Sequence, residues 1–271
     1  MVKIRQDNFD IGKICVSGQC FRMYDDANGR YHLVANDKYL EIIQDGNEVI
    51  FDTSHEEYED FWRVYFDIDR DYDAVIDSIS HNDSYLLKAA EEGYGIRILR
   101  QDLWEMIVSF LISQRNNITR IRKCIENICS AYGEERISKN GVRYHAFPTP
   151  EALAVVSTQE LMGCNLGYRA AYVSKTAKQV ASGEFSLAAL EDMDYISRRE
   201  KLMTLYGVGP KVADCICLFA LGDTQSFPVD THILQAINNN YDGSFPIEQY
   251  GRYAGILQQY IFYHELFGQS I

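Results

Sequence analysis

The sequence predicts an α+β fold in which a small antiparallel sheet, with helices, packs on an all-helical body. Two patterns predict it: short alternating runs separated by turn-forming residues before Thr53, and apolar residues at three- and four-residue spacing from Ser54 onward. The chain has 271 residues, 46% of them hydrophobic, which is enough for one large core or two modest ones. A turn at Gly93-Tyr94-Gly95 is the expected boundary between a first domain, residues 1–95, and a second domain, residues 96–271.

The region from Ile14 to Thr53 is typical of strands. Asp45-Gly46-Asn47 is a hairpin signal, because its glycine and Asx residues tolerate the positive φ of tight turns. We expect the strands to form one antiparallel sheet. They cover residues 20–24, 31–35, 39–43 and 49–51.

The helices are expected from apolar residues that return to one face. Ser54 is the expected N-cap of the first helix, and Asp230 or its neighbour the expected N-cap of the helix after Pro228. The helices are expected over residues 56–66, 72–91, 102–116, 118–132, 170–182, 198–205, 211–220, 229–239 and 253–266.

Composition restricts the class of protein. The longest good apolar candidate, residues 215–221, is far shorter than the roughly 18 residues that a membrane span needs, and no signal-peptide core follows Met1. Seven cysteines in irregular spacing favour reduced thiols over a disulfide framework. We therefore expect a cytoplasmic, monomeric protein with no membrane partner.

The net charge of −13 initially argues against a partner as acidic as DNA. Its distribution changes that conclusion. Residues 1–95 hold 9 Lys and Arg against 21 Asp and Glu, whereas residues 96–271 hold 17 against 18. The acidity is therefore largely confined to the first third of the chain, and a local cationic groove can still hold DNA.

The most informative segment runs from Leu202 to His232, where two apolar helical segments flank the tight turn Gly207-Val208-Gly209. The two glycines allow positive φ or close backbone approach, and Pro210 suits the first position of a helix. Unpaired amides at such a helix start bind a phosphate. Lys211 follows inside the helix, and Asp230 comes nineteen residues later. An amine and a carboxylate beside a phosphate site indicate covalent chemistry on DNA.

Each of these residues alone has a simpler interpretation: Asp230 as a plain helix cap, Lys211 as a solvated surface lysine. An amine nucleophile must be neutral, and a lysine at its reference pKa of about 10.4 is almost wholly protonated at neutral pH. We expect burial and the positive end of the helix to lower the pKa of Lys211.

With these features the chain resembles the helix-hairpin-helix-Gly-Pro-Asp superfamily of base-excision DNA glycosylases, and within it the 8-oxoguanine DNA glycosylase family. The lysine corresponds to the bifunctional, lyase-competent branch. Further matching blocks cover nearly the whole chain in order. They are Ser17-Gly18-Gln19-Cys20-Phe21-Arg22, Leu99-Arg100-Gln101-Asp102, residues 110–120, Tyr144-His145-Ala146-Phe147-Pro148, Gly167-Tyr168-Arg169-Ala170 and Gly251-Arg252-Tyr253-Ala254-Gly255.

The resemblance implies a pocket for a flipped base, because such an enzyme must extrude the nucleotide. It implies that Phe262 and Cys215 sandwich the base and that Gln258 contacts its Watson–Crick edge. Judged alone, Phe262 and Cys215 are core residues. The Gly18 carbonyl would accept from N7–H of 8-oxoguanine and repel N7 of guanine; judged alone, Gly18 is a turn or bulge glycine.

The resemblance also implies contacts to the strand opposite the lesion and to a phosphate. Tyr168 would wedge between bases, and Arg115 departs from the family, which carries asparagine there, so recognition of the opposite cytosine is weakened or achieved differently. His232, otherwise a structural histidine, would lie near a phosphate. The residues expected to face the opposite strand are Arg115, Asn116, Arg120, Tyr168 and Arg169.

No organic cofactor and no catalytic metal are expected. No cysteine follows Cys217, which excludes the four-cysteine iron–sulfur cluster of a related branch. A cation held by hairpin carbonyls would leave no residue signature.

The sequence thus predicts a bifunctional 8-oxoguanine DNA glycosylase and apurinic/apyrimidinic lyase that acts on damaged double-stranded DNA. Two alternatives stay open. One is a glycosylase of the same fold for another damaged base, such as an alkylated purine. The other is a non-catalytic helix-hairpin-helix DNA-binding module.

Overall fold

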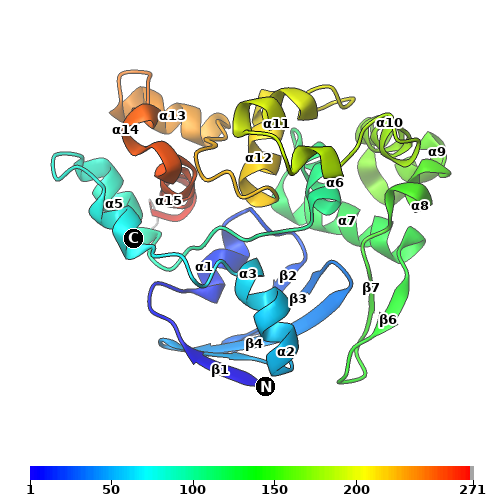
Figure 1. Ribbon diagram of the computed structural model, residues 1–271, viewed down its shortest axis with the longest axis horizontal. Helices are drawn as coiled ribbons and strands as arrows, with labels where there is room; N and C mark the ends of the chain where they lie inside the picture. The colour runs from blue at the N-terminus through cyan, green and yellow to red at the C-terminus, as the bar shows by residue number, and fades with distance from the viewer. Residues whose placement is uncertain (269–271) are drawn as a thin grey trace.

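A computed structural model describes residues 1–268. A five-stranded sheet lies below a body of helices, with helix α1 between the two layers (Figure 1). This arrangement confirms the predicted α+β fold with an N-terminal antiparallel sheet.

The sheet is antiparallel throughout, in the order β1-β5-β4-β3-β2. The predicted strands are present, and β1 is an addition that the sequence prediction lacked. Leu33, Leu40, Ile42 and Phe51 are fully buried on the sheet's core face. The strands are β1 (Val2–Arg5), β2 (Met23–Asp25), β3 (Arg30–Ala35), β4 (Lys38–Asp45) and β5 (Glu48–Phe51).

Residues 11–16 form a helix, α1 (Ile11–Val16), although strand structure was expected from Ile14 onward. Asp10 caps this helix by accepting from the Lys13 amide at 2.9 Å. Ile11, Ile14 and Cys15 are buried at helical spacing, so burial favours a helix in this short segment.

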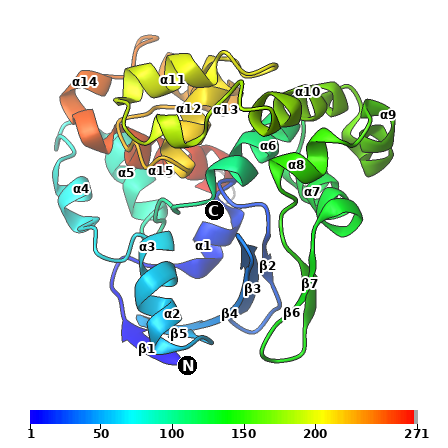
Figure 2. The same ribbon diagram turned by 45° about the vertical axis from the view of Figure 1, so that its right-hand side comes forward.

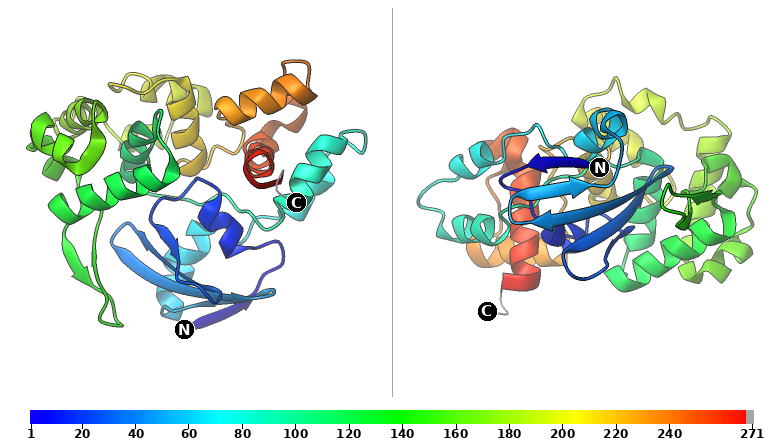
Figure 3. Two further views of the ribbon diagram at one scale, coloured as in Figure 1. Left: turned by 180° about the vertical axis from the view of Figure 1, so that it is seen from behind. Right: turned by 90° about the horizontal axis from the view of Figure 1, so that it is seen from below.

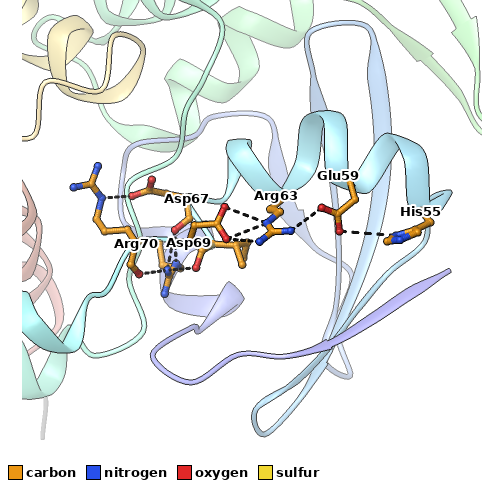
Figure 4. Close-up of polar contacts among 8 residues, drawn as sticks. His55, Glu59, Arg63, Asp67, Asp69 and Arg70 are labelled. Atoms are coloured by element: carbon orange, nitrogen blue, oxygen red, sulfur yellow. Dashed lines mark hydrogen bonds and ion pairs between the residues drawn. The ribbon is translucent and has the colours of Figure 1, made fainter.

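The predicted helix over residues 56–66 is one continuous helical stretch with a π turn in its middle. It comprises α2 (His55–Glu57), the π turn Tyr58–Trp62 and α3 (Arg63–Tyr65), and Ser54 caps it as expected. Along its exposed side, ion pairs connect His55 to Glu59, Glu59 to Arg63 and Arg63 to Asp69 (Figure 4). Glu59 on this helix and Asp69 in the segment after it are therefore paired with Arg63.

The predicted single helix over residues 72–91 is wrong. The chain forms α4 (Asp73–Asp77) and α5 (Ser84–Glu92), because Asp83 starts a new helix by accepting from the Leu86 amide at 2.9 Å. Both helices belong to the core of the helical body, and α5 packs beside α15 (Figure 3). The core beside the sheet takes its residues from positions 9–66 and from Leu99, whereas Phe21 belongs to the core of the helical body. The two cores therefore interleave along the chain, and the boundary near residue 95 stays a prediction.

The other predicted helices are present; the one over residues 118–132 has the predicted ends, and the rest have shifted ends. The first of them ends at Ser113 instead of Asn116, because the chain turns at Arg115, whose φ is +47°. They are α6 (Leu103–Ser113), α7 (Ile118–Tyr132), α10 (Arg169–Ala181), α11 (Tyr195–Leu202), α12 (Pro210–Phe219), α13 (Thr231–Asn240) and α15 (Ala254–Phe267).

Several short elements were not predicted. The hairpin of β6 (Glu135–Ile137) and β7 (Arg143–His145) extends from the helical body alongside the sheet (Figure 2). Lys139 in its loop pairs with Asp52 at 2.7 Å. The remaining short elements are α8 (Pro150–Ala154), α9 (Thr158–Leu161), the π turn Met162–Leu166, the 3-10 turns Ala188–Leu190 and Gly251–Tyr253, and α14 (Ile247–Tyr250).

Within residues 1–268, no helix combines the length and the apolar character that crossing a membrane requires.

Candidate functional site

Ten of the fifteen predicted site residues line a small cavity or the groove into which it opens. The five that line neither are Gly207, Val208, Arg120, Tyr168 and Arg169. The cavity, of about 40 Å³, lies between the loop after α1, the start of α12 and the middle of α15. The groove, of about 740 Å³, shares Gly18, Phe110, Lys211, Asp230 and Phe262 with the cavity. It continues along residues 113–118 on one side and Thr231-His232 on the other.

The turn between α11 and α12 has the geometry of a backbone phosphate site. Gly207 has φ +91°, and a Cβ there would lie 2.7 Å from the Tyr172 ring. Gly209, by contrast, has an extended φ of −99°, and a Cβ there would meet no atom of residues 1–268 within 4 Å. Gly209 is the N-cap of α12, and no side chain in the described part of the chain caps this helix. The first amides of α12 therefore face open space, where an anion can approach them.

Lys211 lies in the first turn of α12, half-buried, and lines both the cavity and the groove. Its Nζ is 5.5 Å from the centroid of the Phe110 ring. The expected lowering of its pKa is wrong: the neighbouring Cys215 sulfur and the Asp230 carboxylate raise the pKa of Lys211 more than burial lowers it. A raised pKa favours the ammonium form of this side chain.

Asp230 has two roles in the structure. It is the N-cap of α13, accepting from the Ile233 amide at 2.9 Å, as the sequence predicted. Its side chain also lines the cavity and the groove with Lys211. The two groups form no direct ion pair within 4.0 Å in residues 1–268. The cap thus fixes the carboxylate beside the amine without a direct ion pair.

The four residues predicted to contact the base line the same cavity: Gly18, Cys215, Gln258 and Phe262. Gly18 has φ +78°, and a Cβ there would lie 3.1 Å from the Phe262 ring. Cys215 and Gln258 are each 3% exposed, and burial raises the pKa of the Cys215 thiol. Gln258 donates through Nε2 to the Pro228 carbonyl at 3.0 Å.

Buried polar contacts hold the Gly18 loop against the helical body. Gln19 donates to the Arg97 carbonyl at 2.9 Å and accepts from the Leu99 amide at 2.8 Å. Gln101 in turn donates to the Gln19 carbonyl at 2.8 Å. These contacts fix Gln19, the residue directly after Gly18, through both its side chain and its carbonyl.

The residues predicted to face the opposite strand fall into two groups. Arg115, Arg120 and Tyr168 are exposed, and Tyr168 is 52% accessible. Arg115 and Asn116 line the groove, while Asn116 also donates to the Ile112 carbonyl at 3.1 Å. Arg120 and Tyr168 line neither the groove nor the cavity, so of the three exposed side chains only Arg115 lies on the groove.

Arg169 lies where the sequence did not place it. It is only 3% exposed, and its guanidinium donates to the Gln114 carbonyl at 2.8 Å and the Arg115 carbonyl at 2.7 Å. It also lies 4.5 Å from the Tyr168 ring centroid. In this structure Arg169 supports the turn that carries Arg115 instead of facing solvent as a surface charge.

His232 is exposed on the groove, edge-to-face with Phe262 at a centroid distance of 6.1 Å.

Sequence reasoning missed three residues that shape the site. Gln114 donates to the Gly207 carbonyl at 3.0 Å, Tyr172 packs under Gly207, and Gln259 lines the cavity beside Gln258. Two of them had a signal in the sequence: Gln259 is a second glutamine next to a predicted contact, and Gln114 lies inside the matching block 110–120. In the part of the chain that the structure describes, no cluster of three His, Cys, Asp or Glu side chains is placed to hold a metal.

Comparisons with known proteins agree over both halves of the chain. Residues 1–107 match the family model of the 8-oxoguanine DNA glycosylase N-terminal domain, and residues 108–242 that of the HhH-GPD superfamily of base excision DNA repair proteins. The structure of Clostridium acetobutylicum 8-oxoguanine glycosylase/lyase, in complex with double-stranded DNA containing cytosine opposite 8-oxoguanine, is similar at a TM-score of 0.92 and 37% identity. That match covers 97% of this chain and 93% of the Clostridium chain.

Two sequence relatives carry related names. A probable N-glycosylase/DNA lyase of Methanothermobacter thermautotrophicus is 32% identical over 78% of this chain and 75% of its own length. The N-glycosylase/DNA lyase of Saccharomyces cerevisiae is 38% identical over 54% of this chain. The match spans only 42% of the yeast protein, so this chain corresponds to less than half of that relative's length.

Proposed function

The chain belongs to the 8-oxoguanine DNA glycosylase family of the HhH-GPD superfamily, and on that premise we propose that it is a bifunctional DNA glycosylase and apurinic/apyrimidinic lyase. Its substrate is 8-oxoguanine in double-stranded DNA. The observation that carries the proposal is the convergence of Lys211, Asp230, Gly18 and Gln258, which come from distant parts of the chain, on one cavity. An uncapped helix start lies next to it.

The reaction begins with the lysine. The neutral Lys211 Nζ attacks C1′ of the damaged nucleotide, the N-glycosidic bond breaks, and the base leaves with the bonding electrons and takes up a proton. Because the pKa of Lys211 is raised, a nearby group must first accept the ammonium proton. Asp230 lines the same cavity and stabilises the positive charge that develops on the sugar.

Strand cleavage follows from the same covalent bond. The C1′–O4′ bond of the sugar ring then breaks: the nitrogen lone pair forms the C1′=N bond of a protonated Schiff base, and O4′ keeps the bonding electrons and takes up a proton to become a hydroxyl. Loss of a proton from C2′ then expels the 3′ phosphate, and water releases Lys211 from the product. The chain needs no organic cofactor for these steps, since the Schiff-base nitrogen accepts the electrons.

DNA is held on either side of the cavity. The first amides of α12 receive a backbone phosphate of the damaged strand, and the exposed His232 lies near another. Tyr168 wedges into the duplex, and Arg115, Asn116 and Arg120 face the base left opposite. Arg169 supports this group through the carbonyls of residues 114 and 115. We propose a cytoplasmic location, which rests on the seven free thiols.

Single-turnover excision from three matched duplexes tests this function: one with 8-oxoguanine, one with an alkylated purine and one undamaged. We expect excision of 8-oxoguanine followed by strand cleavage, with both lost in Lys211→Gln. Excision of only the alkylated purine would replace the proposal with a same-fold glycosylase of different specificity. Binding of damaged DNA without excision would indicate a DNA-binding module.

A further inference from the structure

The cavity contains a glutamine to which the proposed mechanism gives no role. Gln259 is 3% exposed on α15, directly after Gln258, and both line the cavity. Its Oε1 is buried and has no hydrogen-bond partner among residues 1–268. An unpaired buried carbonyl costs about 1–3 kcal/mol, so such an oxygen on a residue that lines a binding cavity indicates a missing donor.

The two glutamine side chains form a directed relay. Gln259 donates through Nε2 to Gln258 Oε1 at 3.1 Å, and Gln258 donates through Nε2 to the Pro228 carbonyl at 3.0 Å. If the Gln258 amide were flipped, its NH₂ would face the Gln259 NH₂ and its oxygen would face the Pro228 carbonyl. The relay therefore fixes the direction of both amides.

With both amides fixed in these directions, three hydrogen-bonding positions on the two glutamines remain for a ligand. Gln258 keeps one N–H and one lone pair, and Gln259 adds a free acceptor. The edge of a base that complements this set has one acceptor and two donors: a keto oxygen, a ring N–H and an exocyclic amine. A 2-amino-6-keto purine has that edge, whereas an adenine-type edge has a single donor beside an acceptor nitrogen.

We propose that Gln259 is a specificity-determining residue whose Oε1 accepts a hydrogen bond from the exocyclic amine of the flipped purine, while its Nε2 holds the Gln258 amide in the orientation that receives the rest of the edge. The proposal rests on the proposed function and narrows its substrate to bases with that amine. A base without the amine leaves the buried oxygen unpaired, and the site discriminates against it for that reason.

The test compares 8-oxoguanine with 8-oxohypoxanthine, which differs only by the missing amine. We expect the single-turnover rate constant of wild-type protein to be about tenfold higher for 8-oxoguanine than for 8-oxohypoxanthine. A tenfold rate difference corresponds to the free energy of about one buried hydrogen bond. Gln259→Met, of similar shape but without donor or acceptor, is expected to excise both bases at nearly equal rates. Gln259→Glu keeps an acceptor and is expected to retain the preference for the amine.

Two controls separate recognition from folding. Cleavage of a duplex with a preformed abasic site needs Lys211 but no base, so Gln259→Met is expected to retain it. Gln44→Met removes a glutamine of the sheet that donates to the Phe9 carbonyl at 2.7 Å, outside the cavity. It is expected to lower the melting temperature and to keep the tenfold preference.

Equal wild-type rates on the two bases would overturn the proposal, whether or not any variant folds. An unchanged preference in Gln259→Met would do the same. Failure of the wild-type protein to excise either base, with excision of another lesion, would overturn the proposed function and this proposal with it.

Discussion

Alanine substitution is expected to have different effects at the two glycines of the α11–α12 turn: a loss of stability at Gly207 and a loss of DNA affinity at Gly209. A Cβ on Gly207 would lie 2.7 Å from the Tyr172 ring, and the substituted residue would have to keep a backbone φ of +91°. The left-handed conformation costs about 1–2 kcal/mol and the forced contact about 1–3 kcal/mol, so Gly207→Ala is expected to lower the free energy of unfolding by roughly 3 kcal/mol. Gly141, with φ +80° and no atom within 4 Å in the described residues, is the matched control. Gly141→Ala is expected to cost only about 1 kcal/mol.

Gly209→Ala is expected to change stability by less than about 1 kcal/mol, because its φ of −99° suits alanine and its Cβ meets no neighbour among residues 1–268. The methyl group would instead occupy the space through which a phosphate approaches the α12 amides. We expect DNA affinity to fall by about tenfold or more. Denaturant unfolding followed by the fluorescence of Trp62 and Trp104, both buried, measures the first effect, and anisotropy with an abasic-analogue duplex the second. Equal stability losses at positions 207 and 209, with unchanged affinity in Gly209→Ala, would refute the assignment of this turn.

Three further predictions follow from the site and its surroundings. Because the pKa of Lys211 is raised and the amine form attacks, single-turnover cleavage of abasic DNA is expected to rise about tenfold per pH unit between pH 6 and 8; a flat profile would contradict this. Burial raises the pKa of Glu105 from 4.5 to about 7, so its contribution to stability is fully present below 4.5 and is lost as pH rises to about 7. Wild type is therefore expected to lose stability relative to Glu105→Gln across that window in denaturant unfolding, and a pH-independent difference would refute the shift. Arg115→Asn is expected to raise the preference for cytosine opposite the lesion about fivefold in excision assays on the four opposing bases; an unchanged preference would remove Arg115 from that role.

The local sequence pattern was sufficient to predict the elements that form through contacts between residues close in sequence. The strands around Asp45-Gly46-Asn47 pair as predicted, since hairpin chemistry and alternation act over a few residues. The break between α4 and α5 was missed because the apolar spacing continues through it, while the Asp83 cap outweighs that spacing. Residues 11–16 form a helix for a related reason, the Asp10 cap.

The site was predictable as a set of residues but not as a set of contacts. The glycine turn, Lys211 and Asp230 are close in sequence, and their spacing indicates their chemistry. The raised pKa of Lys211 depends on Cys215 and Asp230 together, and the burial of Arg169 depends on carbonyls more than fifty residues away. The hydrogen-bond relay through Gln259 depends on the contact between Gln258 and the Pro228 carbonyl. No local sequence pattern predicts that contact, because the two residues are 30 positions apart.

Borohydride trapping tests the central claim most directly. Wild-type protein and Lys211→Gln are incubated with a duplex containing 8-oxoguanine, and the Schiff base is reduced to a stable adduct. We predict a covalent protein–DNA adduct with wild-type protein that requires both the lesion and Lys211. An adduct that persists in Lys211→Gln, or tight binding of the lesion duplex by wild-type protein without any adduct, would contradict the account.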